Sequence, residues 1–177
     1  MPARRYYRTG REEATERGET VGERLEPLRK TIEVEVSAVD AFRIWTEELG
    51  EWWPLATHSV GRGDAVSCTL EGRAGGWIYE STRPGDQHVW GTITQWDPPR
   101  RLAHSWHPGG HAADATTVEL TFRPVGGNRT RLDLVHGGWP ASAADRRAED
   151  DKGWDFVLGD CYRAWANRSD ARAADRA

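Results

Sequence analysis

The sequence has few sulfur-containing residues and no long apolar run. Only two cysteines, Cys68 and Cys161, and one methionine occur among 177 residues. A secreted domain of this size usually carries more cysteine, and the first ten residues, MPARRYYRTG, lack the apolar segment of a signal peptide. No run of about eighteen apolar residues predicts a membrane-spanning helix. We therefore expect a cytoplasmic protein without a disulfide framework.

Neither sign of charge is in large excess. The chain has 24 Lys and Arg against 28 Asp and Glu, a net charge of −4. Arginines among the first residues are followed by glutamates that cancel their field, which is typical of a solvated segment. A weakly acidic chain has no general attraction to polyanions or to anionic bilayers. The charge balance predicts no nucleic-acid partner and no membrane partner.

The chain also lacks the short motifs of several common enzyme classes. It contains no Gly-x-Ser-x-Gly elbow, no phosphate-binding Gly-x-x-x-x-Gly-Lys and no Gly-x-Gly-x-x-Gly after a strand. His104, His107 and His111 are close in sequence, but on a strand the first two point to opposite faces. No Cys pair or Glu-x-x-His motif accompanies them. We therefore expect no metal ion and no cofactor.

Tryptophan, in contrast, is abundant. Ten occur, against three phenylalanines and four tyrosines. Large flat side chains with one N–H each take the places where most proteins use Leu, Phe or Met. Because Cys68 and Cys161 fall on apolar positions of a predicted strand and helix, they are expected to pack as small apolar side chains.

Composition and periodicity divide the chain into three parts. Residues 1–30 are rich in charge and glycine and are interpreted as a flexible N-terminal arm. Residues 31–167 carry the regular hydrophobic patterns and form the predicted domain. Residues 168–177, mainly Ala, Arg and Asp, are interpreted as a frayed C-terminal tail.

The order of elements inside the domain follows from changes of period. A strand begins at Thr31, and Ser37 then begins an amphipathic helix that Gly50 is expected to end, with a second short helical turn after it. Between residues 65 and 137, six alternating runs separated by Gly, Pro, Asp or Asn predict an antiparallel meander. Apolar residues at spacings of three and four then predict a long helix from Ser142 to Asn167.

Three segments carry a family resemblance, namely WGTITQWDPPRRLAHSWHP at 90–108, TTVELTFRPVGGNRTRLDLVHGGW at 116–139 and GWDFVLGDCYRAWA from Gly153. In these segments and in its order of elements, the chain resembles the START-like (SRPBCC) superfamily. The sequences of these three segments are similar to those of the family related to the C-terminal domain of the heat-shock protein 90 ATPase activator. The resemblance covers about residues 31 to 167 and implies an α+β helix-grip fold. In that fold a curved antiparallel sheet of about seven strands wraps around a long C-terminal helix, with one or two short helices after the first strand.

A concave sheet facing a helix predicts a cavity between them, with aromatic side chains and a few polar groups on its walls. Strand alternation and the helical stripe assign the inward positions. Trp53 is placed near the mouth. The twelve candidate ligand-binding residues are Trp53, Trp77, Tyr79, His104, Trp106, Leu120, Phe122, Leu134, His136, Trp154, Leu158 and Cys161.

Three functions are compatible with this pattern, and the sequence indicates no particular oligomeric state. The first is binding of a small hydrophobic or aromatic molecule in the cavity, with no catalytic residue assigned. The second is an aromatase/cyclase-like enzyme in which His104 or His136, helped by Tyr79, acts as acid or base. The third is a co-chaperone-like ATPase activator. Because the arm is too short to be the activator's separate N-terminal domain, contact with a chaperone is the least favoured.

Overall fold

A computed structural model describes residues 23–83 and 85–174 of the chain. Most of the predicted N-terminal arm falls on residues 1–22, outside the described residues. The first strand begins at Leu28 rather than Thr31, so residues 28–30 are part of the sheet. At the other end, the last helix continues to Ala174, beyond the predicted end at Asn167. The first strand therefore begins before the predicted residue, and the last helix ends after the predicted one.

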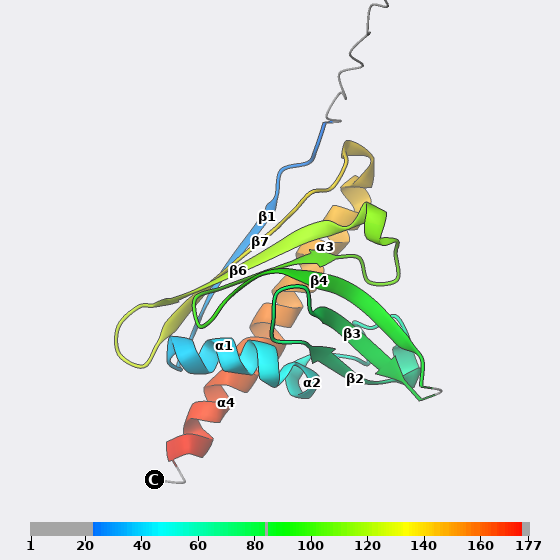
Figure 1. The fold of residues 1–177 in the computed structure, drawn as a ribbon. Coiled ribbons are helices and arrows are strands. Elements are labelled where there is room, and N and C mark those ends of the chain that lie inside the picture. The colour runs from blue at the N-terminus through cyan, green and yellow to red at the C-terminus, as the bar shows by residue number, and fades with distance from the viewer. Residues whose placement is uncertain (1–22, 84, 175–177) are drawn as a thin grey trace, which may run out of the picture.

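Seven antiparallel strands form one sheet in the order β1-β7-β6-β5-β4-β3-β2 (Figure 1). Strands β2 to β7 follow one another as a meander because their connections are short, and β1 pairs with β7 at the far edge. This confirms the predicted seven-stranded sheet. The strands are β1 (Leu28–Val34), β2 (Ala65–Leu70), β3 (Trp77–Thr82), β4 (Gln87–Asp97), β5 (Arg101–Trp106), β6 (Thr116–Pro124) and β7 (Thr130–Gly137).

Two short helices follow the first strand, α1 (Ala38–Glu47) and α2 (Leu49–Trp52). The Ser37 side chain accepts a hydrogen bond from Asp40 N at 3.1 Å, which confirms the predicted start of α1. The predicted stop at Gly50 is wrong, because α1 ends at Glu47 and Gly50 lies inside α2. A Cβ at Gly50 would stand 3.0 Å from the carbonyl oxygen of Cys68, so this glycine lets α2 lie close against β2.

A long C-terminal helix crosses the concave face of the sheet, which curves around it in Figure 1. It runs as α3 (Ala144–Phe156), a π-helical segment η4 (Val157–Tyr162) and α4 (Arg163–Ala174). Its buried side chains include Trp154, Leu158 and Tyr162, as the apolar stripe predicted. The Tyr162 hydroxyl donates to the carbonyl oxygen of Ala41 at 2.7 Å, which ties the helix to α1. Three 3-10 turns complete the elements: η1 (Arg62–Asp64), η2 (Ala112–Asp114) and η3 (Ala141–Ala143).

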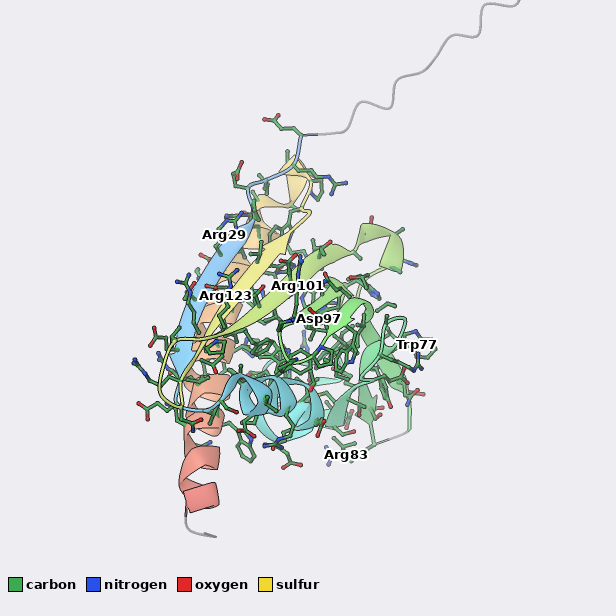
Figure 2. The ribbon with its side chains drawn as sticks, turned by 60° about the vertical axis from the view of Figure 1, so that its left-hand side comes forward. Arg29, Trp77, Arg83, Asp97, Arg101 and Arg123 are labelled. Carbon is green, nitrogen blue, oxygen red and sulfur yellow. The ribbon has the colours of Figure 1, made fainter. Side chains whose placement is uncertain are left out.

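The inward faces of β5, β6 and β7 agree with the alternation in the sequence, and their buried residues include Leu102, Leu120 and Leu134. Strand β3 has the opposite phase from the prediction. Its buried residues are Ile78, Glu80 and Thr82, whereas Trp77 is 50% exposed and Tyr79 is half-buried on the outer face. Figure 2 shows the Trp77 side chain pointing away from the rest of the fold. Trp77 and Tyr79 therefore do not face the helix.

Candidate ligand-binding cleft

The space between sheet and helix is filled by side chains. Only about 10 Å³ is free there, which is room for about one water molecule. Four of the predicted wall residues belong to the packed core at 2% exposure or less. These are Leu120, Phe122, Leu134 and Leu158. The remaining gap is lined by Trp45, Leu49, Trp53, Leu70, Ile78, Trp90, His104, Trp106 and Trp154.

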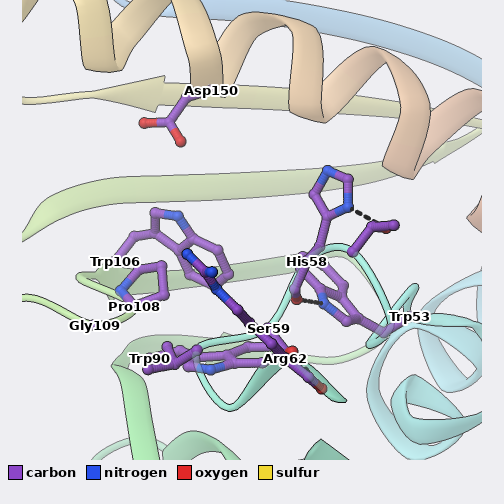
Figure 3. A pocket seen from close by; sticks show the side chains of 11 residues that line it. Trp53, His58, Ser59, Arg62, Trp90, Trp106, Pro108, Gly109 and Asp150 are labelled. Carbon is purple, nitrogen blue, oxygen red and sulfur yellow. Dashed lines mark hydrogen bonds between the residues drawn. The ribbon is translucent and has the colours of Figure 1, made fainter.

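An open cleft lies instead at the mouth of this interior, between the loop after α2, the ends of β4 and β5, and helix α3 (Figure 3). It has a large lobe of about 410 Å³ and a small lobe of about 250 Å³. Trp53, His58, Trp106 and Asp150 line both lobes, so we treat them as one cleft. The large lobe is completed by Thr57, Ser59, Val60, Arg62, Trp90, Pro108 and Gly109, and the small lobe by Glu149, Gly153, Trp154 and Val157.

Indole rings form the floor of the cleft. Trp53 packs against Trp90, Trp106 and Trp154 with ring centroids 5.2, 5.9 and 6.2 Å away. Such tilted and edge-to-face pairs are the favoured arrangements of aromatic rings. None of the four rings exceeds 9% exposure. The floor is therefore rigid and apolar, and it presents ring surface rather than flexible chains.

Three of these four indoles have their N–H groups occupied. Trp53 donates to the carbonyl oxygen of His58 at 2.7 Å, Trp90 to Glu80 at 3.0 Å and Trp154 to His136 at 2.9 Å. Among residues 23–83 and 85–174, Trp106 Nε1 has no hydrogen-bond partner. Its indole nitrogen points toward the Asp150 side of the cleft in Figure 3. Trp106 thus offers one free donor to a molecule in the cleft.

A buried carboxylate holds the loop wall of the cleft. Glu80 has no exposed surface and accepts hydrogen bonds from Val60 N at 2.8 Å, from Gly61 N and from the Trp90 indole. A Cβ at Gly61 would stand 2.6 Å from the Thr82 side chain, so only glycine allows this close approach. These three donors explain why an acidic residue is stable on the inner face of β3.

Two of the titratable groups that line the cleft, one from a loop and one from a helix, have shifted pKa values. The His58 ring stacks on Phe156 at 5.4 Å, its Nδ1 lies 2.9 Å from the Thr57 hydroxyl, and burial lowers its pKa. Asp150 extends from α3, and burial raises the pKa of its carboxyl group although Trp139 Nε1 donates to it at 3.3 Å. Burial therefore makes the charged form of each group less favourable than it is in water.

The two histidines predicted as acid or base lie in the core. His136 has no exposed surface, and both of its ring nitrogens are engaged. Because Trp154 donates to Nδ1, the proton is assigned to Nε2, which donates to Thr116 Oγ1 at 2.7 Å. His104 is 2% exposed, with Nδ1 2.9 Å from the carbonyl oxygen of Ser105. Burial lowers their pKa values, to about 4 for His104 and about 3 for His136, so both are neutral structural groups.

Three of the twelve predicted residues, Trp53, Trp106 and Trp154, line the cleft. Cys161 is half-buried on η4 and lines neither lobe. Sequence reasoning missed the wall residues His58, Trp90 and Asp150, among others. His58 lies in a loop that has no hydrophobic periodicity. Asp150 is part of a run of charged residues, a pattern that is typical of a solvated helix face.

Two further observations limit the chemistry of the described chain. No group of three His, Cys, Asp or Glu side chains within it is arranged to hold a metal ion. None of its helices has both the length and the apolar character needed to cross a bilayer.

A curved seven-stranded antiparallel sheet around a long C-terminal helix, with short helices after the first strand, defines the helix-grip fold of the START-like (SRPBCC) superfamily. Within it, the chain belongs to the Activator of Hsp90 ATPase homolog 1-like family, whose model matches residues 35–160. This confirms the resemblance noted in the sequence. No curated protein sequence gives a significant match.

Solved structures agree on the fold. The chain is similar to the self-sacrificing resistance protein CalC from Micromonospora echinospora, with a TM-score of 0.63 and 23% identity over 81% of this chain and 96% of that one. It is also similar to protein NE0264 from Nitrosomonas europaea, with a TM-score of 0.62 and 17% identity over 82% of this chain and 97% of that one. For the Aha1 dimer from Colwellia psychrerythraea the TM-score is 0.57, with 17% identity over 76% of this chain and 91% of that one. At these identities the similarity establishes architecture and not activity.

Proposed function

We propose that the protein binds a small hydrophobic or aromatic molecule in the cleft between the loop after α2 and helix α3. The observation that carries this proposal is an open space of about 410 Å³ above packed indoles, with the Trp106 N–H directed into it and unpartnered within the described chain. A largely apolar concavity with a few placed polar groups is the usual form of a small-molecule site.

The polar groups are few and distinct. Trp106 Nε1 donates, the Asp150 carboxylate accepts, and His58 presents an imidazole whose lowered pKa keeps it uncharged at neutral pH. An aromatic ligand would stack on or pack edge-to-face against the indole floor. Its polar substituents would meet these three groups. Because the floor is rigid, little ordering is required of the protein when the ligand binds.

The test uses two glycines of the C-terminal helix. Gly153 lines the small lobe, and a Cβ there would lie 3.7 Å from His58 Nε2, so the variant Gly153→Leu extends a side chain into the cleft. Gly159 lies six positions further on the same helix and lines neither lobe, so Gly159→Leu is the matched control.

Binding is measured with N-phenyl-1-naphthylamine, an uncharged apolar probe that accepts energy from tryptophan. For the wild-type protein we expect saturable quenching of tryptophan emission with a Kd in the micromolar range. Gly153→Leu should weaken binding about tenfold or more by occupying the site, which corresponds to about 1.4 kcal/mol, while Gly159→Leu should bind as the wild type does. Absence of saturable quenching, or equal weakening by both variants at unchanged melting temperature, would contradict a ligand site in this cleft.

A further inference from the structure

The small lobe of the cleft carries acidic groups on one wall. Glu149 and Asp150 reach it from consecutive positions of α3, and its lining contains neither Lys nor Arg. Arg62 belongs to the large lobe, on the loop opposite the helix. Arg146, one helical turn before Asp150, acts on that carboxylate but does not line the lobe. The lining of the small lobe therefore holds two acidic side chains and no Lys or Arg, with Arg62 and Arg146 lying outside it.

Three indoles also line the small lobe, two from outside helix α3 and one, Trp154, from the same helix as the carboxylates. The other two are Trp53 and Trp106, and the negative faces of indole rings attract cations. His58 adds no positive charge at neutral pH, because burial lowers its pKa. Carboxylates and indole rings lining one space form the combination that recognises a protonated amine.

An independent feature indicates that a ligand completes this lining. Trp106 is 8% exposed, yet its indole N–H has no partner within residues 23–83 and 85–174, and it is directed into the cleft. Among the described residues, the fully buried side-chain atoms without a partner are Arg101 Nε and His107 Nδ1, so the Trp106 N–H is open to the cleft and available to an acceptor there. A ligand oxygen beside the indole would satisfy it.

We propose that the molecule bound in the cleft is an aromatic amine, whose protonated nitrogen lies in the small lobe between Asp150, Glu149 and the indole rings. Its ring system occupies the large lobe, over Trp53 and Trp90. This proposal rests on the proposed function and adds the chemical class of the ligand. The amine donates to carboxylate oxygen, and no bond is made or broken.

Three probes of the same shape and different charge test the proposal. Calorimetry at pH 7.5 and low salt compares 1-naphthylmethylamine, which is protonated, with the neutral 1-naphthalenemethanol and the anionic 1-naphthoate. The wild-type protein should bind the amine about tenfold more tightly than the alcohol, and the anion most weakly. Raising the salt concentration should reduce this preference, since charges at an open cleft are screened.

The variants Asp150→Asn and Glu149→Gln remove one negative charge each while keeping the size of the side chain. Asp150→Asn should bring the affinities for amine and alcohol to within about twofold of each other. The matched control is Asp145→Asn, which makes the same exchange on α3 at an exposed position that lines neither lobe. It should keep the tenfold preference.

The outcomes separate the two proposals. If the alcohol binds and the amine binds no more tightly, or if Asp150→Asn and Asp145→Asn lose the preference equally, the amine site is refuted and the aromatic cleft stands. If neither the alcohol, the amine nor N-phenyl-1-naphthylamine binds, the proposed function itself fails. An amine preference that depends on Asp150 but not on Asp145 supports both.

Discussion

The stability of this protein should fall between pH 7 and pH 5, because two core histidines are held in the neutral form. Burial lowers the pKa of His104 to about 4 and that of His136 to about 3, from an ordinary value of 6.5. In the unfolded chain both imidazoles take up a proton near pH 6.5. The folded state therefore loses stability as the pH falls below 6.5, until each buried ring protonates at about its own folded pKa.

The size of this effect follows from linkage. At pH 5 an unfolded imidazole is mostly protonated while a buried one is not, which costs each histidine about 2 kcal/mol of stability relative to neutral pH. Two such groups give about 4 kcal/mol, with a limiting slope of about 2.7 kcal/mol per pH unit. A domain of ordinary stability has about 5–15 kcal/mol in total, so the loss is easily measured. His58 adds to it in the same direction, because its pKa is also lowered.

Urea denaturation at intervals of half a pH unit, followed by tryptophan fluorescence, gives the slope. His104→Leu removes one buried titrating ring and should reduce the slope by about half, whatever it does to the absolute stability. His111→Gln removes an exposed histidine and should leave the slope unchanged. Asp150 has the opposite sign, since its raised pKa stabilises the fold only at lower pH, near and below its unfolded value of 3.8. A free energy of unfolding that is flat from pH 7 to pH 5 would refute the assignment of neutral core histidines.

Two other substitutions test the packing that shapes the cleft. Glu80→Gln leaves at least one of the three N–H donors facing an amide NH₂ group, so it should lower the free energy of unfolding by about 2–3 kcal/mol. The control Glu51→Gln, at an exposed position, should change this free energy by less than about 0.5 kcal/mol, and urea denaturation measures both. Gly91→Ala places a Cβ 1.8 Å from the carbonyl oxygen of Ser105 across the β4–β5 pair and should lower the free energy of unfolding by about 3 kcal/mol or more. Gly63→Ala, whose Cβ has open space around it, is the control and should leave the melting temperature nearly unchanged.

Strand alternation predicts the inward face correctly where one face of a strand is uniformly apolar. In β6 the residues Val118, Leu120 and Phe122 alternate with polar neighbours, so only one phase buries them all. Strand β3 offers no such contrast, because both of its faces hold aromatic, apolar or polar residues. Its phase depends on Glu80, which is stable inside only because backbone donors of residues 60 and 61 reach it. Those donors are about twenty positions away in the chain, and no local sequence pattern predicts their contact with Glu80.

The location of the cleft could not be predicted from local sequence patterns either, because its wall residues come from separate elements. His58, Trp90 and Asp150 come from a loop, a strand and a helix, and each has an ordinary local explanation. They meet because Glu80 anchors the loop and because the Trp53 N–H holds the His58 carbonyl oxygen. Gly153 lies within helix α3, where glycine is intrinsically unfavourable, and a Cβ at this position would stand 3.7 Å from His58 Nε2. Besides the three predicted tryptophans, a glycine within a helical pattern was a sequence signal near the site.

Facing inward and lining a cavity are different properties, and only the first has a sequence period. Trp53, Trp90, Trp106 and Trp154 all face inward, yet they pack against one another and leave about 10 Å³ between sheet and helix. Whether such a space stays open depends on the summed volume of side chains from every surrounding element. Here large indoles fill the interior and leave open space only at its mouth, where the loop after α2 and helix α3 diverge. The same tryptophans that fill the interior therefore build the floor of the cleft at its mouth.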